Sequence, residues 1–174
     1  DQMYRYRSVE EAIERALVEK EFRMFYQPII STKTNKIISA EALIRLNDRV
    51  LGYVSPEEFI PISENNGKIM EISEYVIDSV FRFVKENRLE DMGIEFVEMN
   101  LSVMQCMDKK LTEKLQFYLN KYGVDPKQIN LEITETATNF DEERLKKQLA
   151  RIKSLGENPE ELLEDEQFKD LKPY

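Results

Sequence analysis

Hydrophobic residues recur along the chain with two periods, near two residues in some segments and near 3.6 in others, which predict strands and helices respectively. Four segments rich in aromatic and β-branched residues are predicted strands. They cover residues 22–30, 37–45, 94–102 and 129–136. Only six polar residues separate the first two segments, whereas parallel neighbours need a crossover of about a dozen residues or more. The first two strands should therefore form an antiparallel hairpin.

Segments with a helical period lie before, between and after these strands. They predict helices at residues 8–20, from 55 up to 61, at 69–87, at 109–122 and from 141 to 156. Two of them begin with a capping box, at Ser8 and at Ser55, and Pro61 should end the second one early. The order of hairpin, helix, strand, helix, strand and helix is typical of an α/β fold with a mainly parallel sheet.

The chain divides into three parts by composition. Residues 1–20 predict an N-terminal helix or linker, and residues 21–156 carry the alternating strands and helices. Residues 157–174 hold seven acidic and two basic residues, and their Asn-Pro-Glu-Glu start predicts a further helix. We therefore expect one α/β domain with an acidic helical tail.

Each predicted strand after the first carries polar side chains on one face, because successive residues point to opposite faces. That face holds Ser39, Glu41, Leu43 and Arg45, then Glu98, Asn100 and Ser102, then Asn130, Glu132 and Thr134. Two structures explain the pattern: a sheet with one solvated face, or a barrel or half-barrel with a polar interior. Helical crossovers favour the barrel, because they cover the outside of a parallel sheet.

The polar face offers ligands for a metal ion and a phosphate. Glu41, Asn100 and Glu132 lie at similar heights on consecutive strands, which are about 4.8 Å apart. Their oxygens could converge on one divalent cation, Mg²⁺ or Mn²⁺. Arg45 lies on the same face, and its guanidinium group suits a phosphate. Metal with arginine is typical of phosphoryl chemistry.

Composition narrows the chemistry further. The 174 residues include 25 Lys and Arg, 34 Asp and Glu, no His and one Cys, for a net charge of −9. The absence of His excludes His-based triads and His-ligated zinc or haem. The acidity argues against DNA binding through a basic face. Cys106 has no partner for an internal disulfide, which favours a reducing compartment and a packed thiol. No apolar run reaches the roughly 18 residues that cross a bilayer.

Five short motifs follow one another along the chain. They read FYQPI at residues 25–29, AEALIR at 40–45, SPEEFIP at 55–61, MNLS at 99–102 and LEITET at 131–136. In this order and spacing they resemble the motifs of the EAL domain, the cyclic di-GMP phosphodiesterase module of bacterial signalling. The similarity runs over about residues 16–156.

The resemblance implies a TIM-like barrel whose first strand is antiparallel. It also implies three metal ligands, three residues that contact cyclic di-GMP, and one residue that anchors a loop. The metal ligands are Glu41, Asn100 and Glu132. The residues that contact cyclic di-GMP are Gln27, Leu43 and Arg45, and the residue that anchors a loop is Glu135.

The resemblance stops at Gly156, before the family's fifth strand with its paired-aspartate motif and before the lysine tied to activation of water. An eight-stranded α/β barrel typically needs about 250 residues. We therefore expect a partial TIM-like barrel of about four strands, with no complete catalytic set in this chain.

The expected function is a non-catalytic regulatory or interaction module of the bacterial cytoplasm that binds cyclic di-GMP. A second copy or another protein would cover the open half-barrel. One alternative is an active Mg²⁺- or Mn²⁺-dependent phosphodiesterase whose missing half comes from another chain or is omitted from the sequence. The other alternative is a remnant, a truncated or recombined gene product without selected activity.

Overall fold

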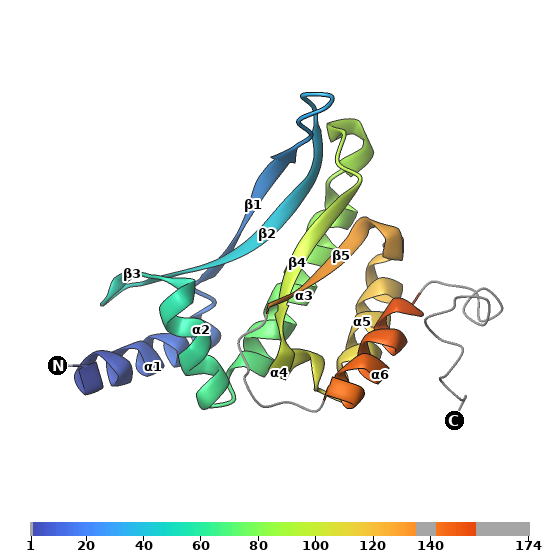
Figure 1. The fold of residues 1–174 in the computed structure, drawn as a ribbon. Helices are drawn as coiled ribbons and strands as arrows, with labels where there is room; N and C mark the ends of the chain where they lie inside the picture. Colours follow the sequence, from blue (N-terminus) through green and yellow to red (C-terminus); the bar gives the residue numbers. More distant parts are fainter. Residues whose placement is uncertain (1, 135–141, 156–174) are drawn as a thin grey trace.

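The computed structural model describes residues 2–134 and 142–155 as alternating strands and helices (Figure 1). In chain order the elements are α1 (Gln2–Glu19), β1 (Phe22–Ile30), β2 (Ile37–Asp48), β3 (Gly52–Val54), α2 (Pro56–Asn65), α3 (Ile69–Glu86), the 3₁₀ turn η1 (Leu89–Met92), β4 (Phe96–Ser102), α4 (Val103–Cys106), α5 (Leu111–Tyr122), η2 (Pro126–Gln128), β5 (Ile129–Thr134) and α6 (Glu142–Lys153). The predicted helix cap at residue 141 and the predicted tail helix lie outside the described residues.

A five-stranded sheet with the order β1-β2-β4-β5 forms the centre of the described structure, and β3 pairs with β2. Strands β1 and β2 are antiparallel, as predicted, whereas β2 with β4 and β4 with β5 are parallel. This topology confirms a partial α/β barrel with an antiparallel first strand. The sequence prediction missed β3, a three-residue strand that pairs with the end of β2.

Strand β2 separates from β4 partway along its length. Their parallel pairing ends at Ala42 opposite Met99, while β2 continues to Asp48 and pairs there with β3. The two strands diverge below this point in Figure 1. The gap between them opens at the carboxyl end of β4, where parallel α/β folds place their functional groups.

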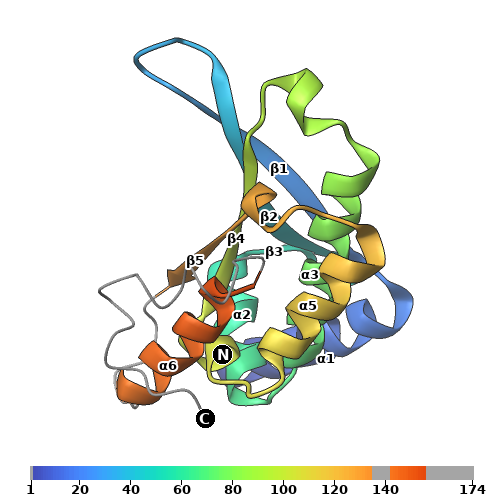
Figure 2. The same cartoon turned by 90° about the vertical axis from the view of Figure 1, so that its right-hand side faces the viewer.

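Helices cover one face of the sheet, and the turned view shows α3 and α5 side by side (Figure 2). Helix α3, predicted at residues 69–87, buries an apolar stripe with helical spacing: Ile72, Val76, Ile77, Val80, Phe81 and Val84. The sheet contributes Ala40, Ala42, Val97 and Met99 to the same core. Burial of this much apolar surface is the main force that holds helices and sheet together.

The first helix begins earlier than predicted. Ser8 lies inside α1, where its hydroxyl donates to the Tyr4 carbonyl at 3.0 Å, and it does not cap the helix. Two contacts favour the longer helix: Val9 and Ile13 are fully buried, and Arg5 donates two hydrogen bonds to Glu58 on α2, at 2.7 and 2.9 Å. These tertiary contacts outweigh the local capping signal.

The prediction that Pro61 ends the second helix is wrong. Helix α2 continues through Pro61 to Asn65, although proline lacks the N–H for one helical hydrogen bond. Phe59 and Ile62, on either side of it, are buried in the core, and the Ser63 hydroxyl donates to the Phe59 carbonyl at 2.7 Å. Packing of the helical residues on both sides of Pro61 compensates for the missing hydrogen bond.

Helix α4 follows β4 in a stretch where the sequence pattern predicted neither a helix nor a strand. Ser102 accepts a hydrogen bond from the Gln105 N–H, and the Gln105 side chain accepts one from the Ser102 N–H, so the two form a capping box. Nothing in the part of the chain that the structure describes is both long and apolar enough to be a membrane-spanning helix.

Candidate functional site

The polar side chains of the sheet lie on the face opposite the helices, and adjacent strands bring them together. Glu41 on β2 is in register with Glu98 on β4, and Asn100 is in register with Glu132 on β5. The Asn100 side-chain Nδ2 donates to Glu41 Oε1 at 2.9 Å. The three residues predicted as metal ligands, Glu41, Asn100 and Glu132, therefore occupy neighbouring positions on three adjacent strands.

A second amide–carboxylate pair lies beside the first. Asn130 Nδ2 donates to Glu98 Oε1 at 3.3 Å across β4 and β5. Glu98 therefore acts as a hydrogen-bond acceptor on this face. In both pairs the carboxylate accepts from an amide, and no cation among the described residues pairs with it.

These residues fit a hard divalent cation by donor type. Carboxylate and amide oxygens on one face suit Mg²⁺ or Mn²⁺, and two of the three residues are already within hydrogen-bonding distance of each other. Within residues 2–134 and 142–155, no group of three or more Asp, Glu, His or Cys side chains is arranged to hold a metal ion. The described set consists of two carboxylates and one amide.

A groove with a cavity volume of about 470 Å³ adjoins the polar face where β2 separates from β4. Its walls come from β2, from α2 and α3, and from the β4–α4 junction. The lining residues are Glu41, Ala42, Leu43, Ile44, Arg45, Pro56, Glu57, Ile60, Ile69, Ile72, Val76, Asn100, Ser102 and Gln105. Glu41, Leu43, Arg45 and Asn100 were expected from the sequence to lie at the site.

Glu57 and Gln105 also line the groove, although the sequence pattern did not predict a role for them at the site. Glu57 belongs to the SPEEFIP motif, whose capping signal predicts only the start of a helix. Gln105 stands three residues after Ser102, a spacing that signals a capping box and that could have predicted α4.

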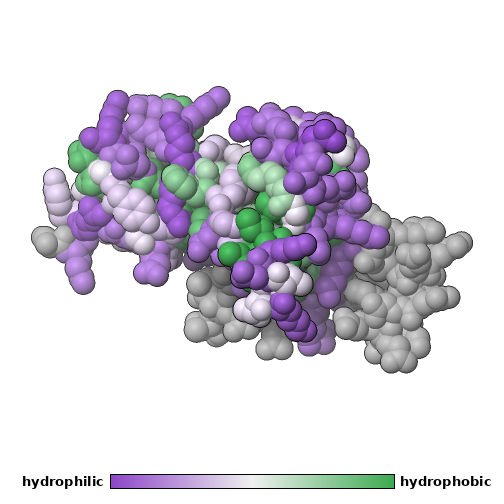
Figure 3. Space-filling view, turned by 90° about the horizontal axis from the view of Figure 1, so that it is seen from above, coloured by the Kyte–Doolittle hydropathy of each residue, from purple (hydrophilic) through white to green (hydrophobic). Residues whose placement is uncertain are grey.

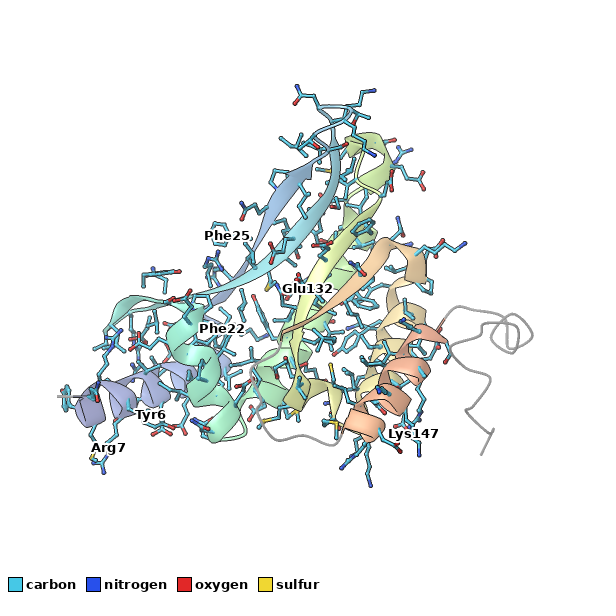
Figure 4. All side chains as sticks on the ribbon, in the orientation of Figure 1. Tyr6, Arg7, Phe22, Phe25, Glu132 and Lys147 are labelled. Atoms are coloured by element: carbon cyan, nitrogen blue, oxygen red, sulfur yellow. The ribbon has the colours of Figure 1, made fainter. Side chains whose placement is uncertain are left out.

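Strand β1 extends the polar face on the far side of β2. Three consecutive pairs on this face are Gln27 with Glu41, Phe25 with Leu43, and Arg23 with Arg45. Phe25 is 59% exposed and is labelled beside β1 in Figure 4, which also labels Glu132 on the central sheet. Gln27 lies next to the predicted metal ligands, whereas Glu135 is outside the described residues.

Cys106 is the packed thiol that the sequence predicted. It is fully buried at the end of α4 and is a free cysteine. Burial raises the pKa of its thiol to about 11, because the charged thiolate loses its solvation. A neutral, inaccessible thiol has no nucleophilic role at this site.

Comparisons with known proteins identify the family. The model of the EAL domain matches residues 10–158. The chain belongs to the EAL domain family. It is 28% identical over 145 residues to the oxygen sensor protein DosP of Escherichia coli (strain K12), and 31% identical over 138 residues to the probable cyclic di-GMP phosphodiesterase PdeB of the same organism.

A solved structure shares the fold. The EAL enzyme Bd1971, in its form with cAMP and cyclic di-GMP bound, superposes with a TM-score of 0.78 at 28% identity, over 90% of this chain and 43% of that one. The matches to DosP and PdeB cover 83% and 75% of this chain but 18% and 25% of those proteins. The chain thus corresponds to part of an EAL domain of cyclic di-GMP signalling proteins.

Proposed function

We propose that this EAL domain binds cyclic di-GMP on the polar face of its sheet and acts as a regulatory module. The observation that carries the proposal is the hydrogen bond from Asn100 to Glu41, with Glu132 in register beside Asn100. This cluster borders the groove that Arg45 lines. The arrangement combines oxygen ligands for a cation with a donor for a phosphate.

Each residue has a proposed role. Glu41, Asn100 and Glu132 would hold Mg²⁺ or Mn²⁺, Arg45 would bind a phosphate, Leu43 would form a wall of the groove, and Gln27 would contact the nucleotide. Glu135 would anchor a loop. A divalent ion bound here would neutralise phosphate charge and, in a complete site, lower the pKa of bound water.

We further propose that this chain alone binds the nucleotide without hydrolysing it. Two carboxylates and one amide provide fewer anionic ligands than a two-metal hydrolytic site uses. Such a module would work in the bacterial cytoplasm and would pass on the bound state through a protein partner or a second copy that covers the open half-barrel.

Calorimetric titration of cyclic di-GMP in the presence of Mn²⁺ tests the proposal. We expect binding by the wild type, loss of binding in Glu41→Ala, and unchanged binding in Glu90→Ala, which removes an exposed carboxylate from η1. An absence of wild-type binding contradicts the proposal.

Chromatography of the same mixtures for linear dinucleotide separates a binding module from an enzyme. We expect no product. Product that forms with the wild type and disappears with Glu41→Ala would instead identify a metal-dependent phosphodiesterase.

A further inference from the structure

Two arginines face each other across β1 and β2 at the end of the polar face. Arg23 is in register with Arg45, and directly opposed residues in antiparallel strands have Cβ atoms about 4.5–5.5 Å apart. Like charges placed opposite each other repel and destabilise a sheet. The stability of the sheet therefore does not explain why the two arginines lie opposite each other.

Neither arginine has an acidic partner in residues 2–134 and 142–155. Other arginines among the described residues have an acidic partner, in the pairs Arg5–Glu58, Arg15–Asp48, Arg49–Glu19 and Arg88–Asp91. Acidic residues outnumber basic ones in the chain, 34 to 25, so acidic side chains are not scarce. The pair Arg23–Arg45 is a local concentration of uncompensated positive charge.

Main-chain carbonyl groups hold both guanidinium groups in place and leave donors open. Arg23 Nη1 donates to the carbonyls of Lys20 and Phe22, at 2.7 and 3.0 Å, and Arg45 Nη1 donates to the carbonyl of Ile44 at 2.9 Å. The Nε and Nη2 donors of both have no protein acceptor among the described residues. An arginine held through one amino group can offer the others to an anion.

We propose that Arg23 is a second anion-binding residue and that Arg23 and Arg45 together bind the phosphates of the nucleotide ligand. The inference deepens the proposed function and rests on it. The order of pairs along β1 and β2 supports a nucleotide: the two arginines, then the apolar pair Phe25 and Leu43, then Gln27 opposite Glu41. Charged, apolar and hydrogen-bonding positions follow one another, as phosphate, ring face and ring edge of a nucleotide require.

The decisive measurement is the affinity of cyclic di-GMP for Arg23 variants. We expect Arg23→Ala to weaken binding about tenfold or more, the effect of one charge-assisted hydrogen bond. Arg23→Lys, which keeps the charge but loses the fork, should fall between Arg23→Ala and the wild type. Arg88→Ala, which removes an exposed arginine from the loop before η1, should bind like the wild type.

A second measurement guards against a folding defect, because Arg23 also donates to carbonyls near the end of α1. We expect inorganic pyrophosphate to raise the melting temperature of the wild type and of Arg88→Ala but not that of Arg23→Ala. A variant that melts like the wild type without ligand, yet does not respond to pyrophosphate, is folded and has lost the anion site.

The outcomes distinguish this inference from the proposed function. If Arg23→Ala and Arg23→Lys bind cyclic di-GMP as tightly as the wild type, the role of Arg23 is refuted while nucleotide binding stands. If the wild type does not bind cyclic di-GMP but pyrophosphate stabilises it through Arg23, the anion site stands and the proposed ligand is wrong. If pyrophosphate and cyclic di-GMP both have no effect on the wild type, both proposals fail.

Discussion

The two faces of the sheet differ in how their side chains are satisfied. On the helix-covered side, Met99 of β4 and the residues that pack there, Phe59 of α2 and Phe81 of α3, are fully or almost fully buried. On the other face, Glu41 and Glu98 share hydrogen bonds with amides, and Arg23 and Arg45 have no acidic partner among the described residues. The residues that hold this fold together and the residues suited to a ligand are therefore different sets.

The surface of the molecule also has hydrophobic and hydrophilic regions. Seen from above, hydrophobic surface lies between two mostly hydrophilic lobes (Figure 3). Exposed apolar side chains such as Phe25 and Ile37 lie on the strands, at 59% and 39% exposure. A face that mixes exposed apolar and uncompensated charged groups is typical of a binding surface.

The arginines of this chain differ in the same way, because some have an acidic partner within the fold and others do not. Arg15 donates to both carboxylate oxygens of Asp48 at 3.1 Å, and Asp48 also accepts from the N–H groups of Val50 and Leu51, at 3.0 and 2.8 Å. This pair ties α1 to the turn between β2 and β3. Arg23 and Arg45 have no such partner among the described residues, which is why we propose that they bind a ligand.

The largest expected effect is on the covered face. Phe81→Ala should lower the free energy of unfolding by about 3–5 kcal/mol, because it leaves a cavity in the core. Phe117→Ala is the matched control, since Phe117 is 60% exposed and its loss should cost well under about 1 kcal/mol. Urea denaturation measures both. Equal losses would show that α3 does not pack on the sheet as described.

The next effect concerns the pair of Arg15 and Asp48. Asp48→Ala should cost about 3 kcal/mol of unfolding free energy, because it removes the acceptor of a part-buried guanidinium and of two main-chain N–H groups. Asp91→Ala, which breaks the exposed pair with Arg88, should cost less than about 1 kcal/mol. The same denaturation experiment compares them, and similar small losses would place Asp48 among the surface charges.

A pH series sharpens the assignment of Asp48. Burial by itself would raise the pKa of this carboxyl, but the hydrogen bonds from Arg15, Leu51 and Val50 outweigh burial and lower it. The stabilisation should be present above the pKa of an unfolded Asp, about 3.9, and be lost as the pH falls towards the lower folded-state value. Asp48→Asn should lack this part of the acid dependence. Parallel stability curves for variant and wild type would contradict the assignment.

The smallest effect on stability is expected on the polar face. Glu41→Gln keeps an acceptor for Asn100 and should change the free energy of unfolding by less than about 0.5 kcal/mol. It should nevertheless abolish the rise in melting temperature that we expect Mn²⁺ to cause in the wild type, because one proposed carboxylate ligand is lost. Thermal melting with and without Mn²⁺ measures both. A strong destabilisation by Glu41→Gln would show that a residue of the polar face also holds the fold together, which contradicts the division between the two faces.

Much of the fold was predictable because its signals are local. The apolar stripe on α3 predicted the covering helix, and the short polar connection at residues 31–36 required a hairpin. Period two placed Glu41 and Asn100 on one polar face. These inferences depend only on residue type and spacing, which the chain carries in any conformation.

Other features depended on contacts between distant residues. Helix α2 passes Pro61 because Phe59 and Ile62 are buried, and α1 begins before Ser8 partly because Arg5 reaches Glu58. The groove exists because β2 leaves β4 after Ala42 and turns to pair with β3. Local propensity contributes a few tenths of a kcal/mol to about 1 kcal/mol per residue, and packing exceeds it.

Residue type and spacing alone predict the order of the four longer strands and of every helix except α4, the antiparallel start of the sheet and the polar side of each strand. The contact of Asn100 with Glu41 and the pairing of Arg23 with Arg45 depend on the folded sheet. The physical reason is register: side-chain alternation is fixed within a strand, but which residue stands opposite is set by the whole sheet.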